Sequence, residues 1–332
     1  MSTSLKKKRV LVTGGSGFIP SHIVHRLVDT GAHVLVTTKY NSIIDNVRLA
    51  DVWDSIDVIE ADLRNQDSIR LIRNAKPDVI IHTAAYNHVG DSFTHFSEAL
   101  DSNLKGTANL IEGLKDFERF VYISTSEVYG FQKTVPFEEL KTPFPTSPYA
   151  VGKYGGELYC RMKHHVTGLP IAVVRPFNAF GPYQSPRAVL AELIINCLRG
   201  VPVRTTEGKQ TREFNYVGNL VDGILMAATN RKAVGEVINL GTGREIPIRD
   251  VVRKIHKLTN SSSRLEIGVL PYRPTEIWRM CASNRKARRI LGWSPEVGFE
   301  EGLKKTIEWY RAFTNEFFNP KSGLNRLARQ AG

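Results

Sequence analysis

The stretch Val10-Leu-Val-Thr-Gly-Gly-Ser-Gly17 places a short apolar segment directly before a glycine-rich turn. A helix is expected after the turn, because apolar residues recur every four positions between 19 and 27. Glycines at 14 and 17 permit a tight turn and let the first amides of the helix face a pyrophosphate. Pro20 stands where a third glycine is usual, which the first turn of a helix tolerates. The stretch predicts a dinucleotide-binding strand-turn-helix unit, although such a turn alone could also be a simple connector.

The rest of the chain continues this alternation. Further strands are expected at 33–38, 57–60, 78–82, 120–124 and 171–175, and helices at 66–74, 93–114 and 147–168. Strands that alternate with helices form a parallel sheet covered on both faces. Beyond residue 180 strands and helices no longer alternate regularly; a helix is expected at 189–199 and one more strand of the main sheet at 237–240.

These patterns predict an α/β fold, a Rossmann-like doubly wound parallel sheet with a smaller carboxyl-terminal substrate lobe. The dinucleotide-binding domain is expected over 5–180, with a returning strand and helix over about 214–242. The smaller lobe is expected over 181–213 and 243–320, where it would complete a ligand cleft.

Composition narrows the classes of function. The chain of 332 residues carries a net charge of +12, but its basic residues are mostly scattered and no nucleic-acid-binding motif accompanies them. Anionic metabolites are therefore expected as partners, and nucleic acid is not. No apolar run approaches the ~20 residues that span a bilayer, and residues 1–9 show no apolar signal segment. A cytoplasmic protein with no membrane partner is expected.

The three cysteines do not indicate a metal or disulfide site. Cys160, Cys197 and Cys281 are odd in number, far apart and without zinc-type spacing. We expect them to be small buried or neutral residues and expect no metal.

A second pattern indicates hydride chemistry. Tyr149 and Lys153 lie four positions apart after the capping pair Ser147-Pro148, so both project from one helix face. To act as a base near neutral pH, a phenol needs its pKa lowered from ~10 toward ~7, about 4 kcal/mol, which one cation at ~4 Å roughly supplies. Lys153 and a positively charged nicotinamide are therefore expected to activate Tyr149. Thr125, at a strand end, would bind the same substrate oxygen, or alternatively only cap a turn.

The end of the second strand bears on the choice of cofactor. An Asp or Glu there normally binds the adenosine ribose of NAD, but this chain has Thr37-Thr38-Lys39. The cation would favour NADP; if Lys39 is only a solvated loop residue, NAD remains open.

Seven segments together resemble the extended short-chain dehydrogenase/reductases that act on nucleotide-linked sugars, also known as the NAD-dependent epimerase/dehydratase family. They are Thr13–Ile19, Ala61–Leu63, His82–Ala85, Asn103 with Gly106-Thr107, Ser124–Gly130, Ser147–Lys153 and Arg175–Asn178. The resemblance extends from Val10 to about Tyr310. It implies cofactor contacts from Gly14, Ser16, Gly17, Phe18, Ile19, Thr38, Lys39, Asp62, Leu63, Ala84, Ala85, Tyr149, Lys153 and Pro176. It also implies a homodimer packed through helices around 93–114 and 147–166.

Within that family, Thr125-Ser126-Glu127 followed by Val-Tyr-Gly130 is similar to 4,6-dehydratases of GDP-mannose and to configuration-retaining dehydratases of UDP-N-acetylglucosamine. The 4-epimerases usually lack this carboxylate. The resemblance implies oxidation at C4 through Tyr149, removal of the C5 hydrogen by Glu127, loss of water from C6 and hydride return to C6. Another dehydratase branch has Asp where this chain has Ser126, so the proton donor to the leaving hydroxyl stays open. Glu127 as a surface turn residue is the alternative.

The resemblance also implies substrate contacts. Arg212 and Arg279 are candidates for the diphosphate of a sugar nucleotide, and Arg187 is a weaker candidate. His88 and Asn178 would face the sugar or its phosphate; the alternative for His88 is a structural histidine. We therefore expect a nucleotide-sugar 4,6-dehydratase acting on a UDP-N-acetylglucosamine-like or related nucleotide-hexose substrate. The alternatives are a 4-epimerase, a UDP-glucuronate-type decarboxylase, and a noncatalytic dinucleotide-binding sensor or scaffold.

Overall fold

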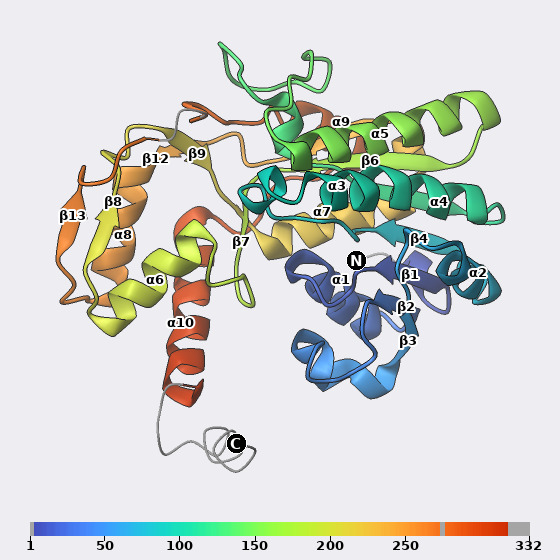
Figure 1. Ribbon diagram of the computed structural model, residues 1–332, viewed down its shortest axis with the longest axis horizontal. Coiled ribbons are helices and arrows are strands. Elements are labelled where there is room, and N and C mark those ends of the chain that lie inside the picture. Colours follow the sequence, from blue (N-terminus) through green and yellow to red (C-terminus); the bar gives the residue numbers. More distant parts are fainter. Residues whose placement is uncertain (1–2, 273–275, 318–332) are drawn as a thin grey trace.

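The computed structural model describes residues 3–272 and 276–317 (Figure 1). At its centre is a seven-stranded sheet with the order β11-β6-β5-β4-β1-β2-β3, in which every neighbouring pair is parallel. Its strands are β1 (Arg9–Thr13), β2 (His33–Thr38), β3 (Ile56–Glu60), β4 (Val79–His82), β5 (Arg119–Ile123), β6 (Ile171–Pro176) and β11 (Val237–Leu240). The strand order reverses between β1 and β4, and ligands bind at such a switch point. The predicted Rossmann-like class is confirmed.

Two layers of helices cover the sheet. One face packs against α1 (Phe18–Asp29), α7 (Val217–Thr229) and α9 (Arg285–Leu291), and the other against α2 (Gln66–Asn74), α4 (Gly106–Gly113) and α5 (Pro148–Thr167). Alternate residues of β1 enter the two layers, with Val10 and Val12 in the first apolar cluster and Leu11 in the second. This burial on both faces explains why the strands are continuously apolar in the sequence.

The long helix predicted over 93–114 is interrupted. A 3-10 turn (Asp91–Phe93) precedes α3 (Phe96–Leu100), a π-helical segment follows over Asp101–Lys105, and α4 completes the run. The π segment turns Asn103 inward, where its amide accepts from the backbone N–H of Tyr86 at 2.8 Å and donates to the carbonyl of Tyr86 at 3.0 Å. A π-bulge often marks a functional site. Here it fixes the loop that follows β4, and periodicity alone does not reveal it.

A smaller lobe lies beside the sheet, on the left in Figure 1. Its apolar cluster draws on α6 (Val189–Arg199), α8 (Ile248–Thr259) and α10 (Phe299–Phe317). Three separate two-stranded pairs accompany these helices: β7 (Ala179–Phe180) with β10 (Asn215–Tyr216), β8 (Val203–Thr205) with β13 (Leu265–Ile267), and β9 (Thr211–Glu213) with β12 (Glu245–Pro247). The expected domain limits stay a prediction, and residues 273–275 and 318–320 of the expected lobe lie outside the described residues.

The structure tests the expectations for the cysteines and for membrane-spanning helices. All three cysteines are buried and free, as expected. Within residues 3–272 and 276–317, no helix has the length and apolar character needed to cross a bilayer.

Candidate active site

A cleft of about 860 Å³ opens at the carboxyl ends of the central strands. Twenty of the twenty-two residues predicted for the site line it: Gly14, Ser16, Gly17, Phe18, Ile19, Thr38, Lys39, Asp62, Leu63, Ala84, Ala85, His88, Thr125, Ser126, Glu127, Tyr149, Lys153, Pro176, Asn178 and Arg187. Arg212 and Arg279 are not among the lining residues. Parallel strands all end at this edge of the sheet, which explains how segments distant in the sequence meet there.

The glycine-rich turn forms the floor of one end of the cleft. Gly14 has a φ of +65°, and a Cβ there would lie 2.9 Å from the Cα of Ala84. Gly17 precedes α1, and no side chain caps the first amides of that helix. Pro20 lies in the first turn, as predicted, and the first α-helical bond runs from the N–H of Ser21 to the carbonyl of Gly17. Open amides behind close-packed glycines fit an anionic pyrophosphate.

The far end of the cleft holds three ion pairs, at the place where the adenosine of a dinucleotide would lie. The ammonium of Lys39 is 3.4 Å from the carboxylate of Glu98. Arg64 binds Asp62 through both carboxylate oxygens and lies 3.7 Å from Glu98, which lowers the pKa of Asp62. Arg64 was missed in the sequence, although it directly follows Asp62-Leu63.

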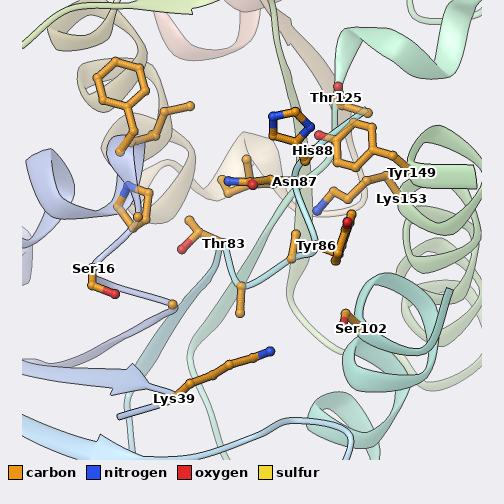
Figure 2. A pocket seen from close by; sticks show the side chains of 18 of the residues that line it. Ser16, Lys39, Thr83, Tyr86, Asn87, His88, Ser102, Thr125, Tyr149 and Lys153 are labelled. Atoms are coloured by element: carbon orange, nitrogen blue, oxygen red, sulfur yellow. The ribbon is translucent and has the colours of Figure 1, made fainter. Parts of the chain in front are cut away.

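Tyr149, Thr125 and Lys153 lie together in the middle of the cleft (Figure 2). Ser147 caps α5 by accepting the N–H of Ala150 at 3.2 Å, and Tyr149 hydrogen-bonds Thr125. The ammonium of Lys153 lies 4.5 Å from the centre of the Tyr122 ring. Helix capping and a buried aromatic ring thus hold the expected trio in place.

The pKa values of this trio differ from the expectation. Burial raises the pKa of Tyr149 to about 12 and lowers that of Lys153 to about 8. Desolvation of the phenolate outweighs the hydrogen bond with Thr125, which lowers the pKa of Tyr149, so the net shift is upward. Ionisation of Tyr149 near neutral pH would therefore also need the positive charge of a bound nicotinamide, as expected from the sequence.

Glu127 lines the cleft beside the trio. It belongs to a 3-10 turn (Ser126–Tyr129) that follows β5, and its N–H donates to the hydroxyl of Thr125 at 3.2 Å. Burial raises the pKa of Glu127; Arg212 opposes this shift and Glu276 adds to it. The charge of Glu127 in turn raises the pKa of Tyr149. Glu127 is thus a half-buried turn residue that faces the cleft, and its catalytic role stays a prediction.

The loop after β4 brings a histidine into the cleft. His88 Nδ1 lies 3.4 Å from Oδ2 of Asp91, and Arg187 binds both oxygens of Asp91 at 3.1 and 3.2 Å. In Figure 2 the His88 ring points toward the hydroxyl ends of Tyr149 and Thr125. Asp91 also lines the cleft and was missed in the sequence, where its position three residues after His88 was the available signal.

The remaining candidates for substrate binding are placed less directly. Arg212 is 2.6 Å from Glu276, and Arg279 pairs with Glu245. Asn178 lines the cleft, and its side-chain amide lies 3.5 Å from the sulfur of Met280. A role for Arg212 and Arg279 in binding a diphosphate stays a prediction.

The fold and the cleft, with a phosphate loop and a Tyr/Lys/Thr set at the switch point, define an extended short-chain dehydrogenase/reductase. The chain belongs to the family described as GDP-mannose 4,6 dehydratase, whose sequence profile matches residues 11–306.

Similar proteins catalyse several reactions on nucleotide sugars. The chain is 32% identical over 336 residues to dTDP-D-glucose 4,6-dehydratase of Bos taurus, covering 96% of this chain and 92% of the relative. It is 34% identical to UDP-N-acetyl-alpha-D-glucosaminuronate decarboxylase of Bacillus cytotoxicus, covering 93% and 100%. Among solved structures, UDP-glucuronic acid 4-epimerase of Bacillus cereus, in complex with UDP-glucuronic acid and NAD, has a TM-score of 0.83 at 30% identity, covering 92% and 99%. The chain therefore belongs to an enzyme family whose members include dehydratases, decarboxylases and epimerases.

Proposed function

We propose that the protein is a nucleotide-sugar 4,6-dehydratase acting on a UDP-N-acetylglucosamine-like or related substrate. The observation that carries the proposal is the carboxylate of Glu127, which lines the same cleft as Tyr149 and Thr125. Oxidation at C4 needs only the Tyr/Lys/Thr set, whereas elimination across C5 and C6 also needs a base near C5.

Each residue has a distinct task in this proposal. A bound nicotinamide would supply a hydride acceptor for C4, a hydride donor for C6 and a positive charge beside the phenol. Thr125 hydrogen-bonds Tyr149 and orients it toward the C4 hydroxyl, whose proton Tyr149 accepts. The C4 ketone acidifies the C5 hydrogen, which Glu127 removes. Because burial raises the pKa of Glu127, its carboxylate is a stronger base than an exposed one.

The substrate and the reaction can be tested together. The protein is incubated with UDP-, GDP-, dTDP- and CDP-hexoses and an added nicotinamide cofactor, and the products are read by mass spectrometry. Loss of one water from one of these sugars is expected. A protein that binds the cofactor but dehydrates none of them would contradict the proposal and support a noncatalytic binding protein.

The same measurement decides between the second candidates. A 4-epimerase, as in the Bacillus cereus structure, yields an isomer of unchanged mass. A decarboxylase, as in the Bacillus cytotoxicus relative, loses one carbon dioxide from a uronic acid substrate. Either outcome with no loss of water would replace the dehydratase proposal.

We further propose a preference for NADP. No carboxylate ends β2, and Lys39 and Arg64 both lie near Glu98 at the adenosine end of the cleft. A 2'-phosphate would compete with Glu98 for these cations. Calorimetric titration should show tighter binding of NADP than of NAD, and Lys39→Gln should weaken NADP binding more than NAD binding. Equal or tighter binding of NAD would contradict this preference.

The remaining residue roles are part of the same proposal. His88, Asn178, Arg187, Arg212 and Arg279 would contact the sugar nucleotide, and the phosphate loop would hold the cofactor. A homodimer is proposed as the assembled form, because large apolar side chains of α5 are exposed, including Leu158, Met162 and Val166.

A further inference from the structure

Dehydration needs a proton for the hydroxyl that leaves C6, and the residue next to Glu127 does not supply it. Ser126 lines the cleft, but a serine hydroxyl is too weak an acid to donate a proton near neutral pH. Tyr149 and Glu127 both accept protons in the earlier steps. With Tyr149 and Glu127 assigned to the C4 and C5 protons, a separate donor would lie on another wall of the cleft.

We propose that His88 is the general acid that protonates the leaving hydroxyl, an inference that rests on the proposed dehydratase function. Imidazole is the side chain best suited to donate a proton near neutral pH. His88 lines the cleft, and Figure 2 shows its ring pointing toward the hydroxyl ends of Tyr149 and Thr125. It thus faces the part of the cleft where the sugar is oxidised.

The loop that carries His88 is held in place from both sides. Asn103 binds the N–H and carbonyl of Tyr86, two residues before His88. Ser92 donates its N–H to the carbonyl of His88 at 3.0 Å and its hydroxyl to that of Val89 at 2.6 Å. The ring therefore projects from a fixed backbone, as a proton donor requires.

Charged neighbours define which ring nitrogen acts. Nδ1 lies 3.4 Å from the carboxylate of Asp91 and 3.5 Å from the backbone N–H of the same residue. Arg187 binds both oxygens of that carboxylate, so Nδ1 is the ring nitrogen already engaged by this cluster. From other elements, Tyr149 of α5 and Glu127 of the 3-10 turn line the same cleft. Among the residues that the structure describes, none hydrogen-bonds Nε2, so we assign the proton transfer to Nε2.

The proton balance supports this assignment. As Glu127 takes the C5 proton, the C5–H electron pair forms the C5=C6 bond. The C6–O pair leaves with oxygen, and the Nε2 proton of His88 converts the departing hydroxide to water. Hydride then adds at C6, and Glu127 returns its proton to C5.

After these steps Tyr149 holds the proton from the C4 hydroxyl, and His88 lacks one. A single transfer from Tyr149 to His88 restores both residues. The orientation of the His88 ring toward the Tyr149 hydroxyl suits that transfer (Figure 2). The cycle thus closes without net proton exchange with solvent.

The test compares two leaving groups in His88→Asn. Its substrates are the nucleotide sugar that the wild-type protein dehydrates and the 6-deoxy-6-fluoro form of that sugar, because fluoride leaves without needing a proton. We expect loss of water from the normal sugar to slow by about 10²–10⁴-fold, while fluoride release stays close to the wild-type rate. Cofactor affinity, measured by calorimetry, should be unchanged. His95→Asn is the matched control, since His95 also neighbours Asp91 but does not line the cleft.

Three results would overturn the assignment. They are near-wild-type dehydration by His88→Asn, an equal loss with both leaving groups, or selective fluoride rescue in Ser126→Ala instead. If the wild-type protein releases neither water nor fluoride from any sugar, the dehydratase proposal itself fails, and His88 has no such role.

Discussion

Replacing Glu127 by glutamine separates C4 oxidation from elimination. The glutamine amide has nearly the same size as the carboxylate. The turn should persist, because the backbone N–H of residue 127 still donates to Thr125 at 3.2 Å. Val128 and Tyr129, which follow in the turn, are fully buried. The change thus removes the base with little structural loss. General-base catalysis contributes about 10²–10⁴-fold, so dehydration should slow by that factor, equivalent to about 3–5 kcal/mol of activation free energy.

The same substitution should not slow C4 oxidation. The charge of Glu127 raises the pKa of Tyr149, so its removal makes the phenol easier to ionise. We therefore expect single-turnover formation of reduced nicotinamide, followed by absorbance, to be as fast as in the wild type or faster. Mass spectrometry should at the same time show that the 4-keto sugar forms without loss of water.

The control is Glu138→Gln, the same chemical change at an exposed residue that pairs with Arg285. It should leave both steps unchanged. Dehydration by Glu127→Gln at the wild-type rate would refute Glu127 as the base, and an equal loss of C4 oxidation would show that the substitution acts on structure.

Three further outcomes are expected. Burial raises the pKa of Glu127 above its usual value of 4.5. Because the base must be ionised, the rate of dehydration should decline as pH falls through that raised pKa. A decline in rate centred at or below pH 4.5 would contradict this prediction. Glu157→Gln should lower the free energy of unfolding by about 3–5 kcal/mol in urea titrations. The reason is that Glu157 is fully buried and binds the equally buried Arg175. An unchanged urea midpoint would show that stability does not depend on this ion pair. Leu158→Glu on α5, where Leu158 is 45% exposed, should convert the proposed homodimer to a monomer in sedimentation velocity, and a wild-type monomer would refute the dimer.

Much of the fold was predictable because it depends on local spacing. Periodicity and capping residues correctly located helices such as α6 (Val189–Arg199) and α2 (Gln66–Asn74). The prediction of one continuous helix over 93–114 was partly wrong, because a π-helical segment interrupts it at Asp101–Lys105. Asn103 in that segment hydrogen-bonds Tyr86, and this tertiary contact leaves no periodic pattern in the sequence. Local propensity cannot anticipate such a contact.

Some residues of the candidate site could be found from the sequence, and others only from the structure. The sequence alone determined the phosphate loop, the Tyr149/Lys153 pair and the presence of a carboxylate at Glu127, since these depend on residue type and short spacing. Tertiary structure decided that Arg64, Glu98 and Asp91 also line the cleft and that burial raises the pKa of Tyr149. It also turned the His88 ring toward that phenol (Figure 2). Ion pairing and desolvation depend on distances between segments far apart in the chain, and only the folded sheet sets those distances.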